Sequence, residues 1–518
     1  MLTPYENNWQ HLSDEFRLVD LLVRREVARQ RARSGAEPQV FKGVYLSDGE
    51  IDRLLDATDA ADAAEEEGGA RAGEPGGAQV GGRPASLPGA GVAALREEVE
   101  GRTRAGLASG VSLAVPRLAE LFGLTPFETQ VLLVCLALEA DLKYEKLFAY
   151  LQDDITRKRP SVELVLRLLC VTREERLRAR ACFAPQAPLF RSRLLRFAEG
   201  GGDAPLLARL VQLDERTADF ILGPVGVGRE AAACARLVSG GAGLSRLRWP
   251  EELKGRLLGI AREHLARPRA AERLLVYHFH GPEGTGRKAL AAALCAELDV
   301  PLLVVDLRLV LSDARDFEAS VRALFREAVL QPAAVYLEHF DLLLREHDER
   351  LPAFRRAVVA ALEEFSRLTF VAADEAWEPA GELNRHLFLS VGLPAPDAGG
   401  RAGLWRALAA ERGCPAPAAG WDELAGRFRL TPGQIDRALV SALNGAHLLR
   451  GGRAARVEPE DLYAACRAQS NQRLAKLARK LAPRHAWPDL VAPADALAQL
   501  RELCARMRHG RKVFGAWG

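Results

Sequence analysis

The stretch RLLVYHFHGPEGTGRKALAAALCAEL, residues 273–298, decides the fold of this chain. It begins with a run of apolar and aromatic residues, 273–281, which is typical of a buried strand. A turn with three glycines follows (Gly281, Gly284 and Gly286), and the Ala- and Leu-rich segment after it predicts a helix. A strand that leads through a glycine-rich turn into a helix is the local arrangement of a phosphate-binding loop.

The alternation of strand and helix continues downstream of this stretch. Three more apolar runs predict strands, at 301–307, 333–341 and 367–377. A helix is expected between the first two of them, around 317–330. Strands separated by helices indicate a parallel sheet with crossover connections. Ligands of such sheets bind beyond the carboxyl ends of the strands, where the glycine-rich turn, Glu338 and Asp374 all fall.

The glycine-rich turn keeps the backbone of a phosphate-binding loop and changes two of its side chains. In a working loop, a Lys follows the last Gly and reaches the β- and γ-phosphates, and the next residue supplies a hydroxyl for Mg²⁺. Here Arg287 stands at the Lys position and Lys288 at the hydroxyl position, so one Mg²⁺ ligand is missing. The nucleotide-binding residues expected of the loop are Gly281, Pro282, Glu283, Gly284, Thr285, Gly286, Arg287, Lys288 and Ala289.

The predicted strand at 333–341 ends in a second altered motif. A motor would carry Asp and then Glu here, to hold Mg²⁺ and to orient the attacking water. This chain carries Glu338 and then His339, so Glu338 is the one weak candidate left for the metal. Removing one preorganised catalytic group commonly costs about a hundred- to a thousandfold in rate. We therefore expect ATP hydrolysis to be slow or absent, while the loop keeps the means to bind ATP or ADP.

Two other interpretations of these residues are possible from the sequence. The glycines can serve backbone shape alone, in a structural turn that binds nothing. His278 and His280 alternate along the first strand like a metal pair, but the sequence offers them no third ligand.

Composition narrows the class of protein. With 518 residues, the chain is too long for one core, so roughly three or four domains are expected. The net charge of +2 gives no reason to expect nucleic acid or a membrane as partner. The eight Cys stand singly, which disfavours zinc and disulfide frameworks and favours a cytoplasmic protein. No signal peptide or membrane span is expected, because no apolar run reaches ~18 residues.

The part upstream of the sheet is expected to be mostly helical. Thr125, Pro126 and Glu128 mark a helix start. The stretch PLFRSRLLRFAEGGGDAPLLARLVQL, 188–213, has two short apolar runs around a glycine turn, which favours the hairpin of a winged helix. Nearer the N-terminus, 11–33 is an amphipathic pattern, and its helix would pack on its own domain or form a subunit or partner contact.

Four segments, taken in order, resemble the AAA family of ATPases. They are GPEGTGRK (281–288), VYLEHFD (335–341), LTFVAADEAW (368–377) and ELNRHLFLSVGLPAPD (382–397). The resemblance implies an αβα sandwich whose catalytic positions are Glu338, His339, Asp374 and Arg385, in degenerate form. Asp374 would hold the sensor-one position, and Arg385 would face a neighbouring subunit. WDELAGRFRLTPGQIDRALVSA (421–442) is similar to the family's helical lid, with Arg437 as a weak sensor-two candidate.

Nearly the whole chain resembles a narrower group, the bacterial AAA ATPases with an N-terminal winged-helix region. Those proteins are often associated with contractile injection particles. The resemblance is carried by YENNWQHLSDE (5–15), LFGLTPFETQVLLVCLALEADLKYEKLFAYLQDD (121–154) and SNQRLAKLARKLAPRHAWPDLVAP (470–493). In that group, a degenerate first AAA module precedes an intact one. WPEELKGRLLGIAREHL (249–265) and WPDLVAPADALAQLRELCARM (487–507) look like the two lead-ins, so the sequence is expected to stop before the second module.

These observations predict a multidomain α/β protein: a mostly helical winged-helix region, then an AAA-type parallel αβα sandwich with a helical lid. The expected division is N-terminal helices at 1–56, a flexible linker at 57–95, a winged-helix-like domain at 96–222, a linker at 223–248, the degenerate AAA domain at 249–393, the lid at 394–468, and a linker with the second lead-in at 469–518.

The function expected from this organisation is that of the regulatory part of an AAA-type ATPase. It would assemble into a homo-oligomeric ring and bind a protein partner through the winged-helix region. The sequence leaves open whether its own module is an enzyme. A structural adaptor that binds no nucleotide is one alternative. A winged-helix DNA-binding regulator is another, and it ranks last because the basic group Arg157, Lys158 and Arg159 is small.

Overall fold

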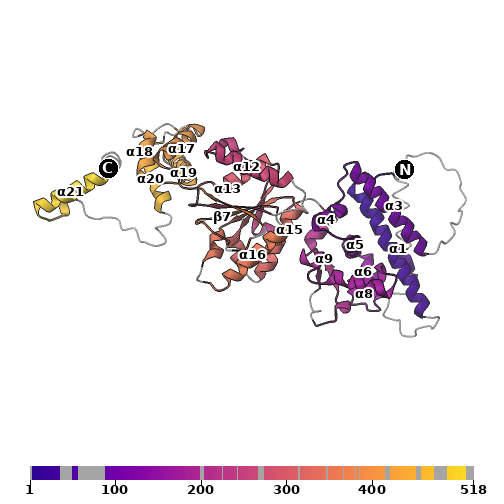
Figure 1. The fold of residues 1–518 in the computed structure, drawn as a ribbon. Helices are drawn as coiled ribbons and strands as arrows, with labels where there is room; N and C mark the ends of the chain where they lie inside the picture. Colours follow the sequence, from indigo (N-terminus) through magenta and orange to yellow (C-terminus); the bar gives the residue numbers. More distant parts are fainter. Residues whose placement is uncertain are drawn as a thin grey trace. The chain divides into compact units, whose positions relative to one another are not determined.

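The structure is a computed structural model and describes most of the chain. The described residues are 3–34, 49–55, 88–198, 203–223, 226–241, 243–266, 274–312, 316–345, 348–365, 367–379, 381–383, 386–414, 420–450, 457–471 and 487–508. They form two units, which Figure 1 colours along the sequence. The N-terminal unit is Met1–Arg236 with Leu309–Ala333, and the C-terminal unit is Leu237–Arg308 with Ala334–Gly518.

The N-terminal unit is built mainly of helices. They are α1 (Asn8–Ser34), α3 (Pro88–Ala108), α4 (Ala114–Phe122), α5 (Pro126–Ala140), α6 (Lys143–Leu151), α7 (Val162–Leu169), α8 (Arg173–Ala179), η1 (Arg180–Phe183), α9 (Pro188–Arg191), η2 (Leu206–Ala208), α10 (Glu215–Leu222), α11 (Arg229–Ala232) and α15 (Phe317–Leu330). A single hairpin accompanies them among the described residues, because β1 (Leu195–Phe197) pairs antiparallel with β2 (Val211–Leu213). The hairpin predicted from the sequence is thereby confirmed.

Helix α1 packs on the domain that follows it. Its apolar stripe is buried, with Leu12, Val23 and Val27 at most 3% exposed. On α6, the Nζ of Lys143 and the hydroxyl of Tyr144 donate to the carboxylate of Asp20, at 3.0 and 2.8 Å. Of the two interpretations offered for this helix, packing on its own domain is the one that the structure supports.

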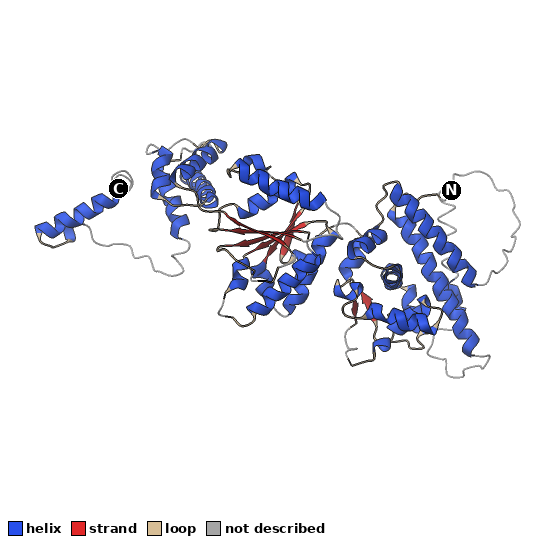
Figure 2. Ribbon diagram, in the orientation of Figure 1, coloured by secondary structure: helices blue, strands red, loops and turns tan. Residues whose placement is uncertain are grey.

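The C-terminal unit contains a sheet whose strands are mostly buried. In spatial order, the strands are β3 (Ala235–Val238), β5 (Leu302–Asp306), β6 (Ala334–Glu338), β7 (Leu368–Ala373), β4 (Leu275–His280) and β8 (Leu387–Gly392). The pairs β5–β6, β6–β7, β7–β4 and β4–β8 are all parallel. The four predicted strands are therefore confirmed as one parallel sheet, and Figure 2 shows helices on both of its faces.

Helices of this unit cover the sheet and continue the chain beyond it. Those beside the sheet are η3 (Leu244–Arg246), α12 (Glu251–Ala266), α13 (Arg287–Glu297), η6 (Phe340–Leu344) and α16 (Leu351–Phe365), and α14 (Leu307–Ser312) leads from β5 into the N-terminal unit. Those further along the chain are α17 (Ala398–Glu411), α18 (Gly420–Arg427), α19 (Pro432–Arg450), α20 (Pro459–Asn471), η8 (Trp487–Asp489) and α21 (Ala494–Arg508). In Figure 1, α12 and α13 lie on one face of the sheet and α16 lies on the other.

The helices α17–α20 form a small core of their own, in the segment expected to be the lid, and they are called the lid below. Its centre is a pair of stacked indoles, Trp405 and Trp421, with ring centroids 5.7 Å apart. Trp405 is fully buried. A separate core of this kind lets the lid keep its shape beside the sheet.

Two expected linkers contain regular structure. In the segment 223–248, the structure has α11, β3 and η3. The strand β3, of only four residues (Ala235–Val238), extends the sheet at its edge despite the glycines around it. The end of the segment 57–95 belongs to α3, which begins at Pro88 and buries Val92. Neither β3 nor the start of α3 was recognised in the sequence, because the small residues in and around them weaken the apolar pattern. Most of the expected 57–95 linker lies outside the described residues.

Among the residues that the structure describes, no helix has the length and apolar character needed to cross a membrane.

Candidate functional site

The glycine-rich turn after β4 has a backbone that only glycine accommodates easily. The φ angles of Gly281, Gly284 and Gly286 are 143°, 87° and 100°, in a region that side chains strain. A Cβ atom on Gly281 would lie 2.2 Å from the carbonyl oxygen of Leu393, and one on Gly284 would lie 2.4 Å from the Oγ1 of Thr431. The turn is therefore held tightly between the end of β8 and the lid.

The turn ends at the N-terminus of α13. Gly286 is the N-cap residue and supplies no side-chain hydrogen bond, so the first turn of the helix has no side-chain cap. Uncapped N–H groups and the helix dipole together attract anions to such a position. Just before it, Thr285 is 1% exposed, and its hydroxyl has no hydrogen-bond partner among the described residues.

Arg287, at the Lys position of the loop, is hydrogen-bonded to the end of β7. Its guanidinium donates to the carbonyl oxygen of Ala373, and its Nη2 lies 3.1 Å from Oδ1 of Asp374. The side chain of Arg287 is only 11% exposed. The structure thus brings together two residues that the sequence singled out, the loop cation and the sensor-one candidate.

Lys288, at the hydroxyl position of the loop, reaches the end of β6. Its Nζ lies 2.8 Å from Oε1 and 3.0 Å from Oε2 of Glu338. The two side chains are 38% and 25% exposed, so the pair is partly accessible to solvent. The carboxylate that the sequence offered as the weak metal ligand is therefore engaged by an ammonium group.

His339 follows Glu338 in a left-handed conformation, with φ 63° and ψ 38°. A non-glycine residue there costs of order 1 kcal/mol and is more frequent at functional sites. His339 lines the same cavity as Lys288 and Glu338.

A further ion pair at this edge was missed in the sequence. Asp306 ends β5, and Arg308 donates to it from Nε at 3.1 Å and from Nη2 at 2.7 Å. The hydrogen bond from Arg308 lowers the pKa of the Asp306 carboxyl and raises the pKa of the guanidinium. The available signal was the strand at 301–307, whose acidic end falls beside that of the next strand.

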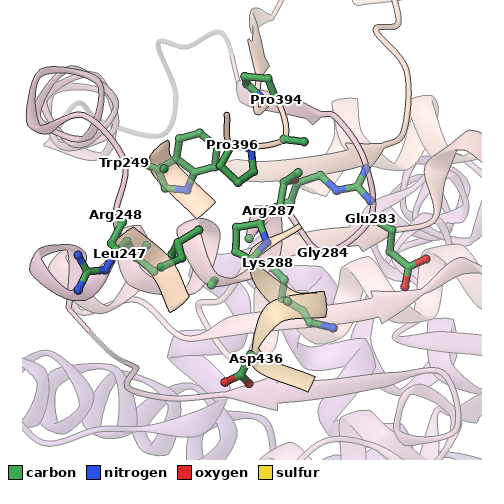
Figure 3. Close-up of a pocket in the computed structure, with 18 of the residues that line it drawn as sticks. Leu247, Arg248, Trp249, Glu283, Gly284, Arg287, Lys288, Pro394, Pro396 and Asp436 are labelled. Atoms are coloured by element: carbon green, nitrogen blue, oxygen red, sulfur yellow. The ribbon is translucent and has the colours of Figure 1, made fainter. Parts of the chain in front are cut away.

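These groups surround an open cavity of about 1870 Å³ within the C-terminal unit. Its wall comes from the segment before α12, the glycine loop, the start of α14, the end of β6, the segment after β8, and the lid. Figure 3 labels Leu247, Arg248, Trp249, Glu283, Gly284, Arg287, Lys288, Pro394, Pro396 and Asp436 among the lining residues. Sequence reasoning found the loop and missed the walls at Trp249, Pro396 and Asp436, which are far from it along the chain.

Other predicted residues lie outside the lining. Gly281 and Pro282 are in the turn but do not line the cavity. Asp374 is also outside the lining, and it contacts Arg287, which is part of the lining. Arg385 lies outside the described residues. Arg437, the weak sensor-two candidate, lines the cavity, and its Nε donates to Oε1 of Gln469 at 3.1 Å.

The lid meets the glycine loop through the main chain. The N–H of Gly433, in the first turn of α19, donates to the carbonyl oxygen of Gly284 at 2.8 Å. Just before α19, the N–H of Thr431 donates to Oε1 of Gln434 at 2.9 Å, which is one of the two bonds of a capping box. The start of this lid helix is therefore fixed directly against the loop.

The two strand histidines, His278 and His280, are stacked with ring centroids 5.4 Å apart. His278 is fully buried, and its Nδ1 lies 3.2 Å from the Oγ of Ser390. Burial lowers the pKa of His278 to about 4, with a smaller effect of the same sign from His280. A neutral, aromatic role in the core follows for His278.

Comparison with known proteins gives three family matches. Residues 1–234 match a winged helix domain of variant type, residues 277–373 match the ATPase family associated with various cellular activities (AAA), and residues 397–472 match the contractile injection system ATPase helical domain. A protein of Dictyostelium discoideum, named as the ribosome biogenesis ATPase nvl, is 32% identical over 86 residues. That match covers 16% of this chain and only 10% of the length of this relative.

Two solved structures are also similar to part of the chain. The crystal structure of the FIGL-1 AAA domain is 14% identical, with a TM-score of 0.35, and the match covers 46% of this chain and 90% of that one. A structure described as the basis for katanin self-assembly is 18% identical, with a TM-score of 0.35, over 48% of this chain and 93% of that one.

Proposed function

From the premise that this chain carries a winged-helix domain, an AAA domain and the helical domain of contractile injection system ATPases, we propose that its AAA domain binds ATP or ADP and hydrolyses it slowly or not at all. One observation carries the proposal. The glycine loop, with Arg287 and Lys288 behind it, opens onto a cavity of about 1870 Å³. The bound nucleotide would serve assembly and partner binding.

Three features support nucleotide binding. The cavity exceeds the roughly 300–1,000 Å³ of an ordinary small-molecule site, so it has room for a nucleoside triphosphate. The uncapped start of α13 carries a partial positive charge of about +0.5, beside two cationic side chains. Trp249 gives the wall an aromatic face on which a base could stack, and its Nε1 lies 3.8 Å from where a Cβ of Gly286 would be.

Two substitutions support slow hydrolysis. Lys288 replaces the hydroxyl that would help to hold Mg²⁺, and it engages Glu338. His339 replaces the carboxylate that would orient the attacking water. Each loss of this kind typically lowers the rate by about a hundred- to a thousandfold, although the two need not multiply. Against a typical turnover on the order of 10 s⁻¹, either loss leaves a slow enzyme.

The test is a calorimetric titration of the 518-residue chain with ATP and ADP, together with a phosphate-release assay on the same preparation. We expect micromolar binding and turnover far below about 10 s⁻¹. Turnover of several per second that Lys288→Ala abolishes would contradict the degenerate site. Absence of binding at millimolar nucleotide would favour the structural adaptor.

Ring assembly extends the proposal. By its resemblance to the finger region of AAA proteins, Arg385 would face a neighbouring subunit. The expected result is a nucleotide-stabilised homo-oligomer, measured by light scattering with and without ATP, that Arg385→Ala weakens. A monomer at every concentration, with and without nucleotide, would contradict it. Binding of a protein partner by the winged-helix domain and a cytoplasmic location remain part of the same proposal.

The basic group of the winged-helix domain gives no support to the DNA-binding alternative. Arg157 pairs with Asp154 at 3.2 Å, and Lys158 pairs with Glu145 at 3.0 Å. Cations that are already paired contribute less to phosphate binding. Salt-dependent binding of duplex DNA by the full chain is the result that would revive this function.

A further inference from the structure

Two side chains meet where a working phosphate-binding loop would hold Mg²⁺. In such a loop, a hydroxyl one residue after the Lys and a carboxylate at the end of a neighbouring strand act on the same ion. In this chain, the corresponding positions belong to Lys288, in the first turn of α13, and Glu338, the last residue of β6. The cation requirement of the site therefore depends on how these two residues are arranged.

The arrangement of Lys288 and Glu338 does not fit Mg²⁺. The ammonium lies 2.8 and 3.0 Å from the two carboxylate oxygens, so both are already engaged by a positive charge. Mg²⁺ requires oxygen ligands at about 2.0–2.1 Å in near-octahedral geometry. An ammonium has no lone pair to offer, and its charge repels a dication beside it.

The rest of the wall does not replace the missing ligands. Asp306, the carboxylate at the end of the neighbouring strand β5, lies outside the lining and accepts three hydrogen bonds from Arg308, one from the backbone N–H and two from the guanidinium. In the described part of the chain, no group of three His, Cys, Asp or Glu side chains is placed to hold a metal. The lining carries six cationic side chains (Arg246, Arg248, Arg287, Lys288, Arg308 and Arg437) and six carboxylates (Glu251, Glu283, Glu338, Asp397, Glu411 and Asp436). Arg287 and Lys288 are the two cations that stand at the start of α13, directly after the glycine loop.

We propose that this site takes a nucleoside di- or triphosphate as the metal-free anion, with the ammonium of Lys288 in the place of Mg²⁺. Lys288 is 38% exposed while it pairs with Glu338, so one of its three N–H groups can still turn to a phosphate oxygen. Glu338 acts as a positioning residue that holds the ammonium over the end of β6. The inference rests on the proposed nucleotide binding and adds to it the absence of a metal requirement.

The first experiment compares calorimetric titrations of the full chain with ADP and with ATP, in millimolar MgCl₂ and in EDTA. We expect dissociation constants in EDTA that are equal to or lower than those in MgCl₂, within about threefold. Binding that disappears in EDTA overturns the inference and leaves the proposed function in place. Absence of binding under both conditions overturns the proposed function itself.

Two variants distinguish a site that uses the ammonium of Lys288, held by Glu338, from a site that uses a metal ion. Lys288→Thr supplies the missing hydroxyl, so we expect binding in EDTA to weaken at least tenfold and MgCl₂ to restore part of it. Glu338→Gln removes a negative charge beside the phosphates and keeps a side-chain oxygen that can accept from the ammonium of Lys288, so we expect binding in EDTA to tighten several-fold. If Glu338 held a metal, the same variant would weaken binding in MgCl₂.

Lys146→Thr is the matched control. Lys146 is an exposed lysine of α6 in the N-terminal unit and pairs with Glu50, so its loss should change neither titration. Thermal unfolding of each variant checks that the fold is retained. An unchanged affinity of folded Lys288→Thr in EDTA would overturn the inference.

Discussion

Arg216 of α10 and Glu327 of α15 form a two-point ion pair inside the N-terminal unit. Nε of Arg216 lies 2.7 Å from Oε2 of Glu327, and Nη2 lies 3.0 Å from Oε1. The side chains are 9% and 1% exposed, and Gln331 donates to the same carboxylate at 3.1 Å. The pair thus joins α10 of the winged-helix match to a helix that lies within the AAA match.

Glu327→Ala should strongly destabilise the N-terminal unit. Removing one partner leaves the guanidinium of Arg216 buried without its counter-charge, which typically costs about 3–5 kcal/mol of the free energy of unfolding. Urea unfolding followed by circular dichroism measures the difference. Glu174→Ala is the control, because its pair with Arg178 is 73% and 79% exposed and should contribute well under about 1 kcal/mol. Equal effects of the two variants would contradict the buried pair.

Gly284→Ala should damage both stability and nucleotide binding. The φ of 87° costs an alanine about 1–2 kcal/mol, and the new methyl group would overlap Oγ1 of Thr431. Differential scanning calorimetry and nucleotide titration are the measurements.

Gly110→Ala is the matched control for this variant. Its φ is 82°, and no atom lies within 4 Å of the added methyl group. It should therefore lose only the free energy of unfolding that the strained backbone conformation costs, and leave the affinity for nucleotide unchanged. A Gly284→Ala variant no less stable than Gly110→Ala would rule out close packing between loop and lid.

His278→Phe should flatten the dependence of stability on pH. The folded pKa of about 4 is below the ordinary value of 6.5, so the unfolded chain binds the extra proton between these values. The stabilisation is complete above pH 6.5 and falls as the pH drops toward 4, by up to about 3 kcal/mol. Phenylalanine fits the aromatic surroundings of Phe388 and Trp377 and does not titrate.

The measurement is denaturant unfolding at pH 7 and pH 5 for the wild type and the variant. His447→Asn, at an exposed position of α19, should keep the pH dependence of the wild type. The interpretation fails if His278→Phe and the wild type lose equal stability between the two pH values.

Arg287→Ala should weaken nucleotide binding by roughly ten- to a hundredfold, since hydrogen bonds to charged groups contribute about 1.5–3 kcal/mol each. Arg287→Lys keeps the positive charge and should lose less. Calorimetric titration measures both. Arg256→Ala, an exposed site on α12 paired with Glu252, should bind as the wild type does. Equal affinities of Arg287→Ala and Arg256→Ala would remove Arg287 from the site.

The sequence predicted the centre of the fold because local signals were strong there. Long apolar runs marked β4 to β7, and glycine spacing marked the loop. The meeting of the loop with Glu338 also followed, since parallel strands end at the same edge. The short edge strand β3, of sequence ARLV, carried too little apolar pattern to be recognised. The strand β8 was seen only as part of a motif.

The far walls of the cavity could not be predicted from local pattern. Trp249 precedes the loop by more than thirty residues, and Asp436 follows it by about a hundred and fifty. Their approach depends on how the lid and the segment before α12 fold back on the sheet, which no spacing rule encodes. The pairing of Lys288 with Glu338 could not be predicted either, because the motif normally has a hydroxyl and a metal ion at that position.

The hydrogen bond from Gly433 to Gly284 has a consequence for how such a protein can evolve. It joins two backbone peptide groups, so it does not depend on the identity of the surrounding side chains. The reactive side chains of the loop can therefore be substituted one after another in evolution while the backbone contact between the loop and the lid is kept. The contact between loop and lid in this chain therefore does not depend on which residues occupy the catalytic positions.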